Sequence, residues 1–373
     1  MEEWKECTIG DVCNTISDTY RGNAKDVVLI NTSDVLEGKC LNHQKTPNKN
    51  LKGQFKKTFQ QGDILYSEIR PANKRYAYVN FAPKDYIAST KLMVIRHNDK
   101  ITPQYLFYIL TNDVIIRELQ MIAESRSGTF PQVTFSELAN FSISLPSISQ
   151  QKEIVAVLKS FDSKIDLNRR INDNLEQQAQ ALFNYYFIDT PEILGEFSVG
   201  SLADAANYVN GLAMQKYRPI SGEKELPVLK IKELGQGRID SSSDFCSNEI
   251  DSYYKVYDGD VIFSWSGTLM VKIWCGGKCG LNQHLFKVSS KTTPKWFYYF
   301  WTKHHLDNFI RIAKDKAVTM GHIKREELEK AEVLFPNNSV MKKLDTLMAP
   351  FLDQIIEKEC EIRKLALLRD TLQ

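Results

Sequence analysis

Side chains that could contact nucleic-acid bases gather in a loop that the sequence contains twice. The first copy follows GDILYS (62–67) and the second follows GDVIFS (259–264). Hydroxyl, amide and basic side chains on loops held by a rigid scaffold are the groups that read base edges in the major groove. The candidates in the first copy are Ser67, Arg70, Asn73, Lys74, Arg75 and Tyr76. The candidates in the second copy are Ser264, Ser266, Thr268 and Lys272.

A second loop with the same kinds of side chain also occurs twice. Gln132 and His322 occupy equivalent places in otherwise divergent turns, which suggests DNA contact. A side chain that caps the turn is the alternative interpretation for either residue. Lys and Arg in these loops favour phosphate contacts, because phosphates take most protein–DNA hydrogen bonds. The candidates are Arg126, Ser127, Thr129 and Gln132 in the first copy and Lys314, Lys316, Thr319 and His322 in the second.

No catalytic constellation is visible in the sequence. An adenine-N6 methyltransferase would need an Asn/Asp-Pro-Pro-aromatic motif and a Gly-rich cofactor loop, and GGKCG (276–280) lacks that spacing. A GxxxxGK[ST] nucleotide loop is absent. Asp258 and Asp260 flank a Gly turn and are most simply solvated turn residues. We therefore expect a chain that is not an enzyme.

Cysteine usage and hydropathy indicate a cytoplasmic protein. The seven cysteines have no disulfide-framework spacing, so we expect reduced thiols. Cys275 and Cys279 with His284 nearby do not follow a standard zinc pattern, and turn or strand roles are preferred over a metal site. No apolar run approaches the roughly 20 residues of a membrane span.

The basic residues are distributed unevenly, although the net charge is only +2. The segments 38–62, 69–84 and 261–306 contain no Asp or Glu but several Lys or Arg, with Tyr, Phe and Trp interleaved. A solvated face is the commoner meaning of such a stretch. Here the stretches flank equivalent turns in both copies, as expected for a surface that follows phosphates.

The duplication extends over nearly the whole chain. Segment 27–39 matches 227–238, 61–70 matches 258–267, 101–110 matches 292–301, and 128–138 matches 318–328. CTIGDVCNTI (7–16) resembles the segment from Phe197 onward. The difference in residue number between matched segments falls from about 199 to 190. This change indicates insertions in loops, while the order of the segments is the same in both copies. This long-period repeat predicts two globular units of roughly 150 residues.

Each copy ends in a long helix with a heptad seam, that is, apolar residues at alternating steps of three and four. At 1.5 Å per residue, the helix of 150–187 should be roughly 55 Å long. Polar residues within the seam usually fix register and partner choice at a cost in stability. The first seam comprises Ile154, Leu158, Phe161, Ile165, Asn168, Asn172, Leu175 and Leu182. The second comprises Leu344, Met348, Phe351, Ile355, Lys358, Ile362, Leu365 and Leu372.

The remaining pattern predicts a mixed α/β (α+β) fold. Short β-branched runs at 27–31, 63–67, 91–96, 228–232, 260–264 and 285–288 predict strands. Segments 103–122 and 294–313, each with Pro near the first turn, predict helices. Strands and helices do not alternate strictly, so a parallel Rossmann sheet is not expected.

In this order, the motifs resemble one family. A variable α/β unit, the GD-[IV]-[LIF]-[YF]-S turn, a helix after TP, and an apolar-Pro pair before a long helix occur twice in tandem. In the first copy this last helix begins with QQKEI (150–154). The whole chain is similar to the specificity (S) subunit of a Type I restriction–modification system. The two variable units share little sequence with each other.

The resemblance implies an architecture and a set of partners. Two target-recognition domains (1–148 and 190–338) would each read one half of a bipartite double-stranded DNA site. Two helices (149–189 and 339–373) would pack antiparallel as a coiled coil and set the spacer. These helices would dock modification subunits, two per chain, which carry S-adenosylmethionine, so this chain would bind no cofactor. Restriction subunits would complete the complex.

A scaffold protein that uses the two helices to tether partners is the alternative function. It would account for the helices, but it would give the two large basic units no role. A scaffold without sequence-specific DNA contact would give no bipartite methylation pattern, which separates the two hypotheses.

Overall fold

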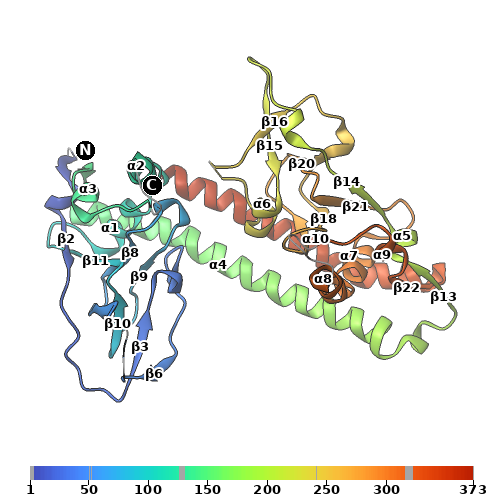
Figure 1. Ribbon diagram of the computed structural model, residues 1–373, viewed down its shortest axis with the longest axis horizontal. Coiled ribbons are helices and arrows are strands. Elements are labelled where there is room, and N and C mark those ends of the chain that lie inside the picture. The colour runs from blue at the N-terminus through green and yellow to red at the C-terminus, as the bar shows by residue number, and fades with distance from the viewer. Residues whose placement is uncertain are drawn as a thin grey trace. The chain divides into compact units, whose positions relative to one another are not determined.

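The computed structural model describes residues 4–49, 51, 53–125, 131–240, 242–315 and 322–372. The chain divides into two compact units. Unit 1 comprises Met1–Asp162 together with Leu367–Gln373, and unit 2 comprises Ser163–Ala366. Each unit is mixed α/β, as the sequence predicted (Figure 1).

Unit 1 contains a four-stranded antiparallel sheet in the order β2-β11-β8-β9. A second sheet, β6-β3-β10-β7, has β3 and β10 parallel, and β1 pairs with β12. The strands are β1 (Lys5–Thr8), β2 (Cys13–Ile16), β3 (Asp26–Ile30), β4 (Val35–Leu36), β5 (Lys39–Cys40), β6 (Lys45–Pro47), β7 (Phe55–Lys57), β8 (Ile64–Ser67), β9 (Tyr76–Tyr78), β10 (Tyr86–Ser89), β11 (Leu92–His97) and β12 (Ser142–Leu145). The helices are α1 (Pro103–Leu110), α2 (Asp113–Ser125) and α3 (Phe135–Ala139).

Unit 2 has the same strand orders. Its sheets are β14-β21-β18-β19 and β16-β15-β20-β17, and β13 pairs with β22. The strands are β13 (Phe197–Ser201), β14 (Asn207–Asn210), β15 (Glu225–Leu229), β16 (Phe245–Ser247), β17 (Lys255–Val256), β18 (Asp260–Ser264), β19 (Met270–Trp274), β20 (Cys279–Leu281), β21 (Leu285–Ser289) and β22 (Glu332–Pro336). The helices are α5 (Leu202–Ala205), α6 (Ile231–Gln236), α7 (Lys295–His304), α8 (Leu306–Asp315) and α9 (Glu326–Glu329).

Short helical turns complete both units. They are η1 (Ile9–Asp11), η2 (Thr32–Asp34), η3 (Pro71–Asn73), η4 (Tyr185–Asp189), η5 (Pro191–Leu194), η6 (Met214–Lys216) and η7 (Ser252–Tyr254).

The predicted internal repeat is confirmed at the level of single turns. Gly62 and Gly259 both have positive φ (92° and 88°) in the same turn before β8 and β18. The predicted pair Gly38 and Gly237 also has positive φ (91° and 72°), but Gly38 lies in the β4–β5 turn and Gly237 caps α6. Side chains other than glycine are strained in this left-handed region, which explains why Gly recurs there. The strand registers align the first matched segments residue by residue. Thr8 caps η1 as Ser201 caps α5, so Cys7 corresponds to Gly200.

Two predicted helices are each interrupted. Segment 103–122 divides into α1 and α2, because the Asn112 side chain accepts a hydrogen bond from the Val114 N–H (2.8 Å) and starts a new helix. Segment 294–313 divides into α7 and α8 at His305. The predicted strand 228–232 also ends early, since α6 begins at Ile231.

The two long helices are α4 (Ile148–Asn184) and α10 (Asn338–Leu372). Within unit 2 they pack antiparallel. The Asn172 amide donates to Glu359 (2.8 Å), and Lys164 pairs with Glu361 (3.5 Å). The later residue of α4 thus contacts the earlier residue of α10, which is the antiparallel arrangement. Asn168 is fully buried in the same layer, and Lys358 donates to Glu361 (3.0 Å). The polar residues within the seam therefore form a layer of amide and charged side chains.

Most of the predicted seam residues are shielded from solvent. Leu372 is the exception, since 57% of its surface is exposed. The buried members are Leu158, Ile165, Asn168, Asn172, Leu344, Met348 and Ile362. The half-buried members are Ile154, Phe161, Leu175, Leu182, Phe351, Ile355, Lys358 and Leu365.

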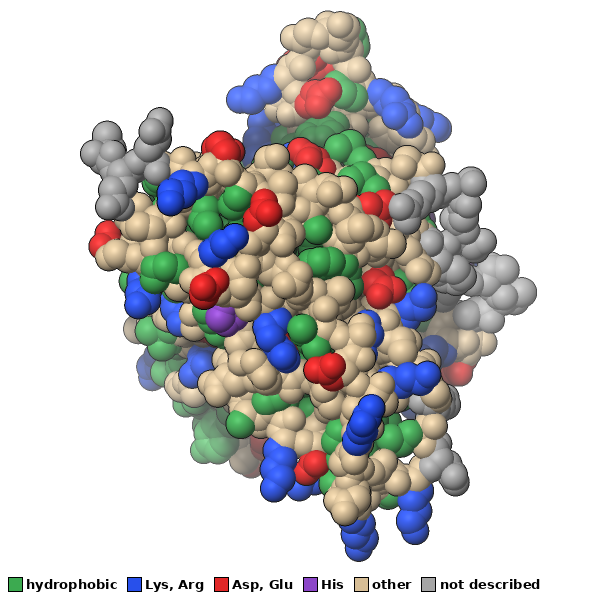
Figure 2. Space-filling view, turned by 90° about the vertical axis from the view of Figure 1, so that its left-hand side faces the viewer, with side chains coloured by type: hydrophobic (Ala, Val, Ile, Leu, Met, Phe, Trp, Pro, Cys, Tyr) green, Lys and Arg blue, Asp and Glu red, His purple; other side chains and the backbone are tan. Residues whose placement is uncertain are grey.

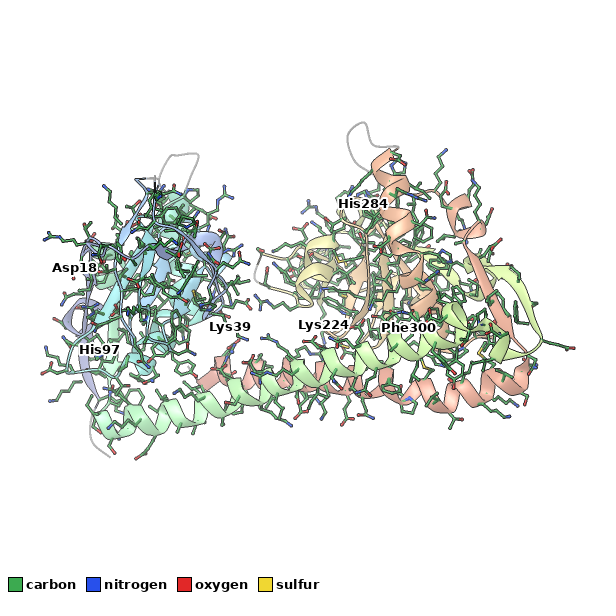
Figure 3. The ribbon with its side chains drawn as sticks, turned by 90° about the horizontal axis from the view of Figure 1, so that it is seen from below. Asp18, Lys39, His97, Lys224, His284 and Phe300 are labelled. Atoms are coloured by element: carbon green, nitrogen blue, oxygen red, sulfur yellow. The ribbon has the colours of Figure 1, made fainter. Side chains whose placement is uncertain are left out.

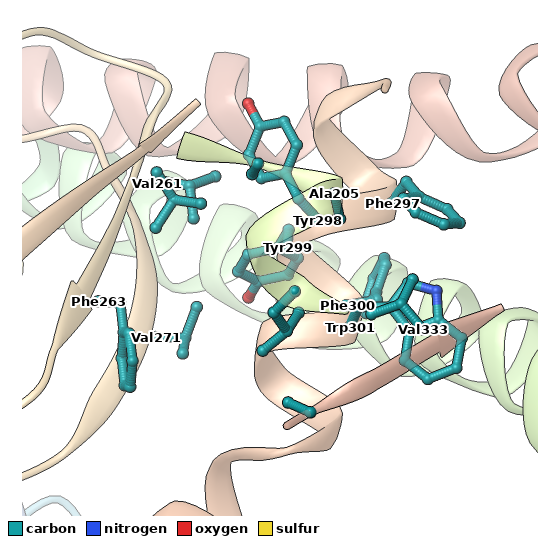
Figure 4. Close-up of a cluster of buried hydrophobic side chains, with 14 of the residues drawn as sticks. Ala205, Val261, Phe263, Val271, Phe297, Tyr298, Tyr299, Phe300, Trp301 and Val333 are labelled. Carbon is teal, nitrogen blue, oxygen red and sulfur yellow. The ribbon is translucent and has the colours of Figure 1, made fainter. Parts of the chain in front are cut away.

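The core of unit 2 is built around α7, whose residues from Trp296 to Trp301 are all buried. Figure 4 shows this helix between the β18–β19 sheet, represented by Val261 and Phe263, and Val333 of β22. The long helices are part of the same core, because Phe183 of α4 and Leu352 of α10 belong to it. The sheet and its loops are thus held on a rigid base.

Candidate nucleic-acid interface

The two predicted loops lie next to each other in each unit. In unit 1, Ile69 forms an antiparallel bridge with Gln132, and the Arg70 N–H donates to the Pro131 carbonyl (3.1 Å). In unit 2, Ser266 forms the same bridge with His322. The repeat thus places Gln132 and His322 at equivalent points, each beside the turn that follows the GD strand.

The first loop of unit 1 presents Arg70 and Asn73 to solvent. Lys74 pairs with Asp113 (2.7 Å), and Arg75 donates to the Ser33 carbonyl (3.1 Å). Arg70 and Lys74 have φ values of 45° and 51°, a region that costs non-glycine residues of order 1–3 kcal/mol. Such strain is often stored at functional loops.

Four of the predicted contact residues point into the protein. Ser67 and Ser266 are 3% exposed, Ser264 is fully buried and Tyr76 is 6% exposed. The Ser67 and Ser264 hydroxyls donate to the carbonyls of Ile69 and Ser266 (3.3 and 3.2 Å), while the Tyr76 ring stacks on Tyr66. Because these four side chains are buried, they are not part of the accessible candidate surface.

In unit 2, Thr268, Lys314 and His322 are exposed. Lys272 is partly covered, because its ammonium donates to the Gly235 carbonyl (2.8 Å). Predicted residues Arg126, Ser127, Thr129, Lys316 and Thr319 lie outside the described residues.

Three residues beside these loops were not singled out from the sequence as DNA contacts. Trp265 follows the GDVIFS strand, and its indole N–H donates to Asn210 (3.0 Å). His284 Nδ1 lies 2.9 Å from the Ser266 hydroxyl. In unit 1, the exposed Lys91 donates to Gln132 (3.3 Å). In the sequence, the tryptophan directly after the GDVIFS strand was the signal that could have marked this loop of unit 2 as a contact surface. Figure 3 shows His284 on the side of unit 2 away from the long helices, whereas Phe300 lies beside them.

The acid-free segments are only partly a free basic surface. Lys287 donates to the Lys255 carbonyl (2.8 Å), Lys303 pairs with Glu176 (2.6 Å), and Lys57 donates to the Leu92 carbonyl (2.8 Å). Burial lowers the pKa of Lys57. On the face of unit 1 in Figure 2, Lys and Arg side chains dominate the lower end, where β3 and β6 lie in Figure 1.

Two thiols and two imidazoles with shifted pKa values lie in the protein interior or near it. Burial raises the pKa of Cys13 and of Cys275 to about 12, which keeps both thiols protonated. Burial lowers the pKa of His304 and of His305, so both imidazoles are neutral at pH 7. Among the residues with described positions, no three His, Cys, Asp or Glu side chains converge as a metal site.

A family model described as the Type I restriction modification DNA specificity domain matches residues 1–177 and again residues 195–368. The chain belongs to this specificity family. The double match agrees with the repeat, and it confirms the predicted class: a DNA-specificity component, the non-catalytic part of a Type I restriction–modification enzyme.

Several proteins resemble this specificity chain. The HindI specificity subunit of Haemophilus influenzae is 46% identical over 191 residues, which cover 51% of this chain and 42% of that relative. The MjaIX specificity subunit of Methanocaldococcus jannaschii is 26% identical over 337 residues, covering 84% and 76%. The crystal structure of a Type I S subunit from M. genitalium has a TM-score of 0.49 at 14% identity, covering 99% and 94%. In the part of the specificity chain that is described, no helix is long and apolar enough to cross a membrane.

Proposed function

We propose that each unit of this specificity chain reads one half of a bipartite duplex DNA target. The observation that supports this is the repeated scaffold, which carries the same pair of adjoining loops twice. Residues 1–148 and 190–338 serve as target-recognition domains, and 149–189 and 339–373 as the helices that set the spacer. The accessible candidates for DNA contact are Arg70, Asn73, Lys74, Arg75, Gln132, Thr268, Lys272, Lys314 and His322.

In this proposal the helices also dock two modification subunits, and restriction subunits join the full complex in the cytoplasm. S-adenosylmethionine binds to the modification subunits. The test is co-expression with a modification subunit followed by genome-wide mapping of methylated adenines. A bipartite motif supports the proposal; a continuous motif, or none, contradicts it.

Exchange of one unit tests whether the two half-sites are read independently. Replacing residues 1–140 with the matching segment of a relative should change one half of the methylated motif and keep the other half and the spacer. The reciprocal exchange of unit 2 is the control. A motif altered in both halves by either exchange would show that the units do not read separately.

Insertion of one heptad into each helix tests the spacer. The insertions, between Asn168 and Asn172 and near Lys358, preserve the faces of both seams. They add about 10 Å at 1.5 Å per residue, or roughly three base pairs at 3.4 Å each. We expect a spacer longer by about three base pairs, with weaker binding because the groove has rotated by roughly a third of a turn. An active variant with the original spacer would contradict this role.

A further inference from the structure

Two backbone hydrogen bonds join the same three segments in both units. The Glu68 N–H donates to the Lys91 carbonyl (3.1 Å), and the Glu68 carbonyl accepts from the Val133 N–H (2.9 Å). In unit 2, the Trp265 N–H donates to the His284 carbonyl (3.4 Å), and the Trp265 carbonyl accepts from the Ile323 N–H (3.1 Å). Residues 68, 91 and 132 therefore correspond to 265, 284 and 322. We call each set the triad of its unit.

The residues next to the triads are nearly the same in the two units, and all are buried. They are Ser67 and Ser264, Leu92 and Leu285, and Val133 and Ile323, all at most 3% exposed. The triads themselves are accessible and differ at every position: Glu68, Lys91 and Gln132 against Trp265, His284 and His322. Buried residues that are nearly the same in both units thus hold two different sets of accessible side chains. This arrangement is expected for positions that determine which DNA sequence is preferred.

The same local turn orients the middle residue of each triad. The Lys91 N–H donates to the Ser89 hydroxyl (3.3 Å), and the His284 N–H donates to the Asn282 side chain (3.3 Å). Such side chain-to-backbone turns fix the local backbone conformation. Each triad therefore presents its middle residue from a fixed backbone.

The chemistry of the two triads differs. In unit 1 the Lys91 ammonium donates to Gln132 Oε1 (3.3 Å), and the Gln132 NH₂ adds a second donor group. In unit 2 the Trp265 ring packs near Phe286, His284 and His322, with centroids 5.7, 6.1 and 6.3 Å apart. Guanine offers two acceptors, O6 and N7, in the major groove, and paired donors suit it best.

We propose that the triads are the base-reading positions of the two units, and that Lys91 and Gln132 bind the O6 and N7 edge of a guanine. This inference rests on the proposed function and names the chemistry of its recognition site. The triad of unit 2 carries aromatic rings in place of Glu68, Lys91 and Gln132 and reads a different base pair.

The test uses the complex of the full chain with its modification subunits. Duplexes that differ at single base pairs of the unit 1 half-site compete for binding, and adenine methylation is mapped in parallel. Lys91→Ala should reduce the preference for one guanine by roughly tenfold to hundredfold, the loss expected for one specific base contact. Lys91→Arg should retain the preference. Lys100→Ala, another exposed lysine of unit 1, should leave the motif unchanged.

A gain of preference tests the same idea in unit 2. His284→Lys combined with His322→Gln should give the unit 2 half-site a new guanine preference while the unit 1 half-site is kept. An unchanged motif in both experiments, or a uniform loss over all duplexes as for a phosphate contact, would overturn the inference. If the wild-type complex methylates no bipartite motif, it is the proposed function that fails.

Discussion

Phe183→Ala is expected to destabilise unit 2 by about 3–5 kcal/mol, the usual cost of removing a buried phenylalanine ring. Phe183 is fully buried, and its ring lies 5.1 Å from Phe187, 5.6 Å from Phe300 and 5.2 Å from Trp301. The neighbouring rings come from α7 and from η4, the turn that follows α4, and each is held by its own backbone, so they cannot all move into the space. The loss should therefore include a cavity term as well as lost burial.

Hydrogen exchange read by mass spectrometry separates the two units in the full chain. Peptides of unit 2 should exchange faster in the variant, while those of the unit 1 sheets should be unchanged. Tyr185→Ala is the control, because this aromatic residue two positions away is 47% exposed and should change the free energy by less than about 0.5 kcal/mol. Equal effects of the two substitutions would contradict the packing described for α4.

Arg96→Ala is expected to cost unit 1 about 3–5 kcal/mol, since it leaves a buried carboxylate without its cation. The Asp63 side chain is 1% exposed, and Arg96 binds it through two hydrogen bonds of 2.7 Å. The Gln60 N–H (2.8 Å) would remain as a donor to this carboxylate. Hydrogen bonding to Asp63 also raises the pKa of Arg96 above its ordinary value.

The measurement is again the exchange rate of amides, now in β8 and β11 of unit 1. Arg117→Ala, an exposed arginine on α2, is the matched control. The equivalent carboxylate of unit 2 gives a further comparison. Asp260 is partly exposed and accepts from the Tyr257 N–H (2.9 Å), so Asp260→Asn should cost far less than the loss of Arg96. Similar losses in both units would show that burial of Asp63 is not the cause.

Periodicity and repetition made the architecture predictable from the sequence. Gly62 and Gly259 mark the same turn because both need a positive φ, and the long helices follow from heptad spacing. Such signals depend only on nearby residues, so they can be recognised in the sequence without knowledge of tertiary contacts. The helix break at Asn112 was missed because apolar spacing continues through it, although Asn is a strong helix start.

The candidate site was less predictable, because the direction of a side chain depends on strand pairing. Ser67 is the last residue of β8 and Ser266 lies in the loop after β18, yet both are buried, and nothing local distinguishes them from exposed serines. The partnership of Lys91 with Gln132 joins residues 41 positions apart. It becomes visible only when β11 is placed beside the segment before α3.

The buried frame around each triad has an evolutionary consequence. Substitutions at accessible positions usually change the free energy of unfolding by less than about 0.5 kcal/mol, whereas changes inside a packed core cost several times more. Glu68, Lys91 and Gln132 can therefore mutate without bringing the chain near its stability threshold. Under the proposed role, the target sequence of one unit can drift while the fold stays constant. A host could thus acquire a new methylation pattern through a few surface substitutions.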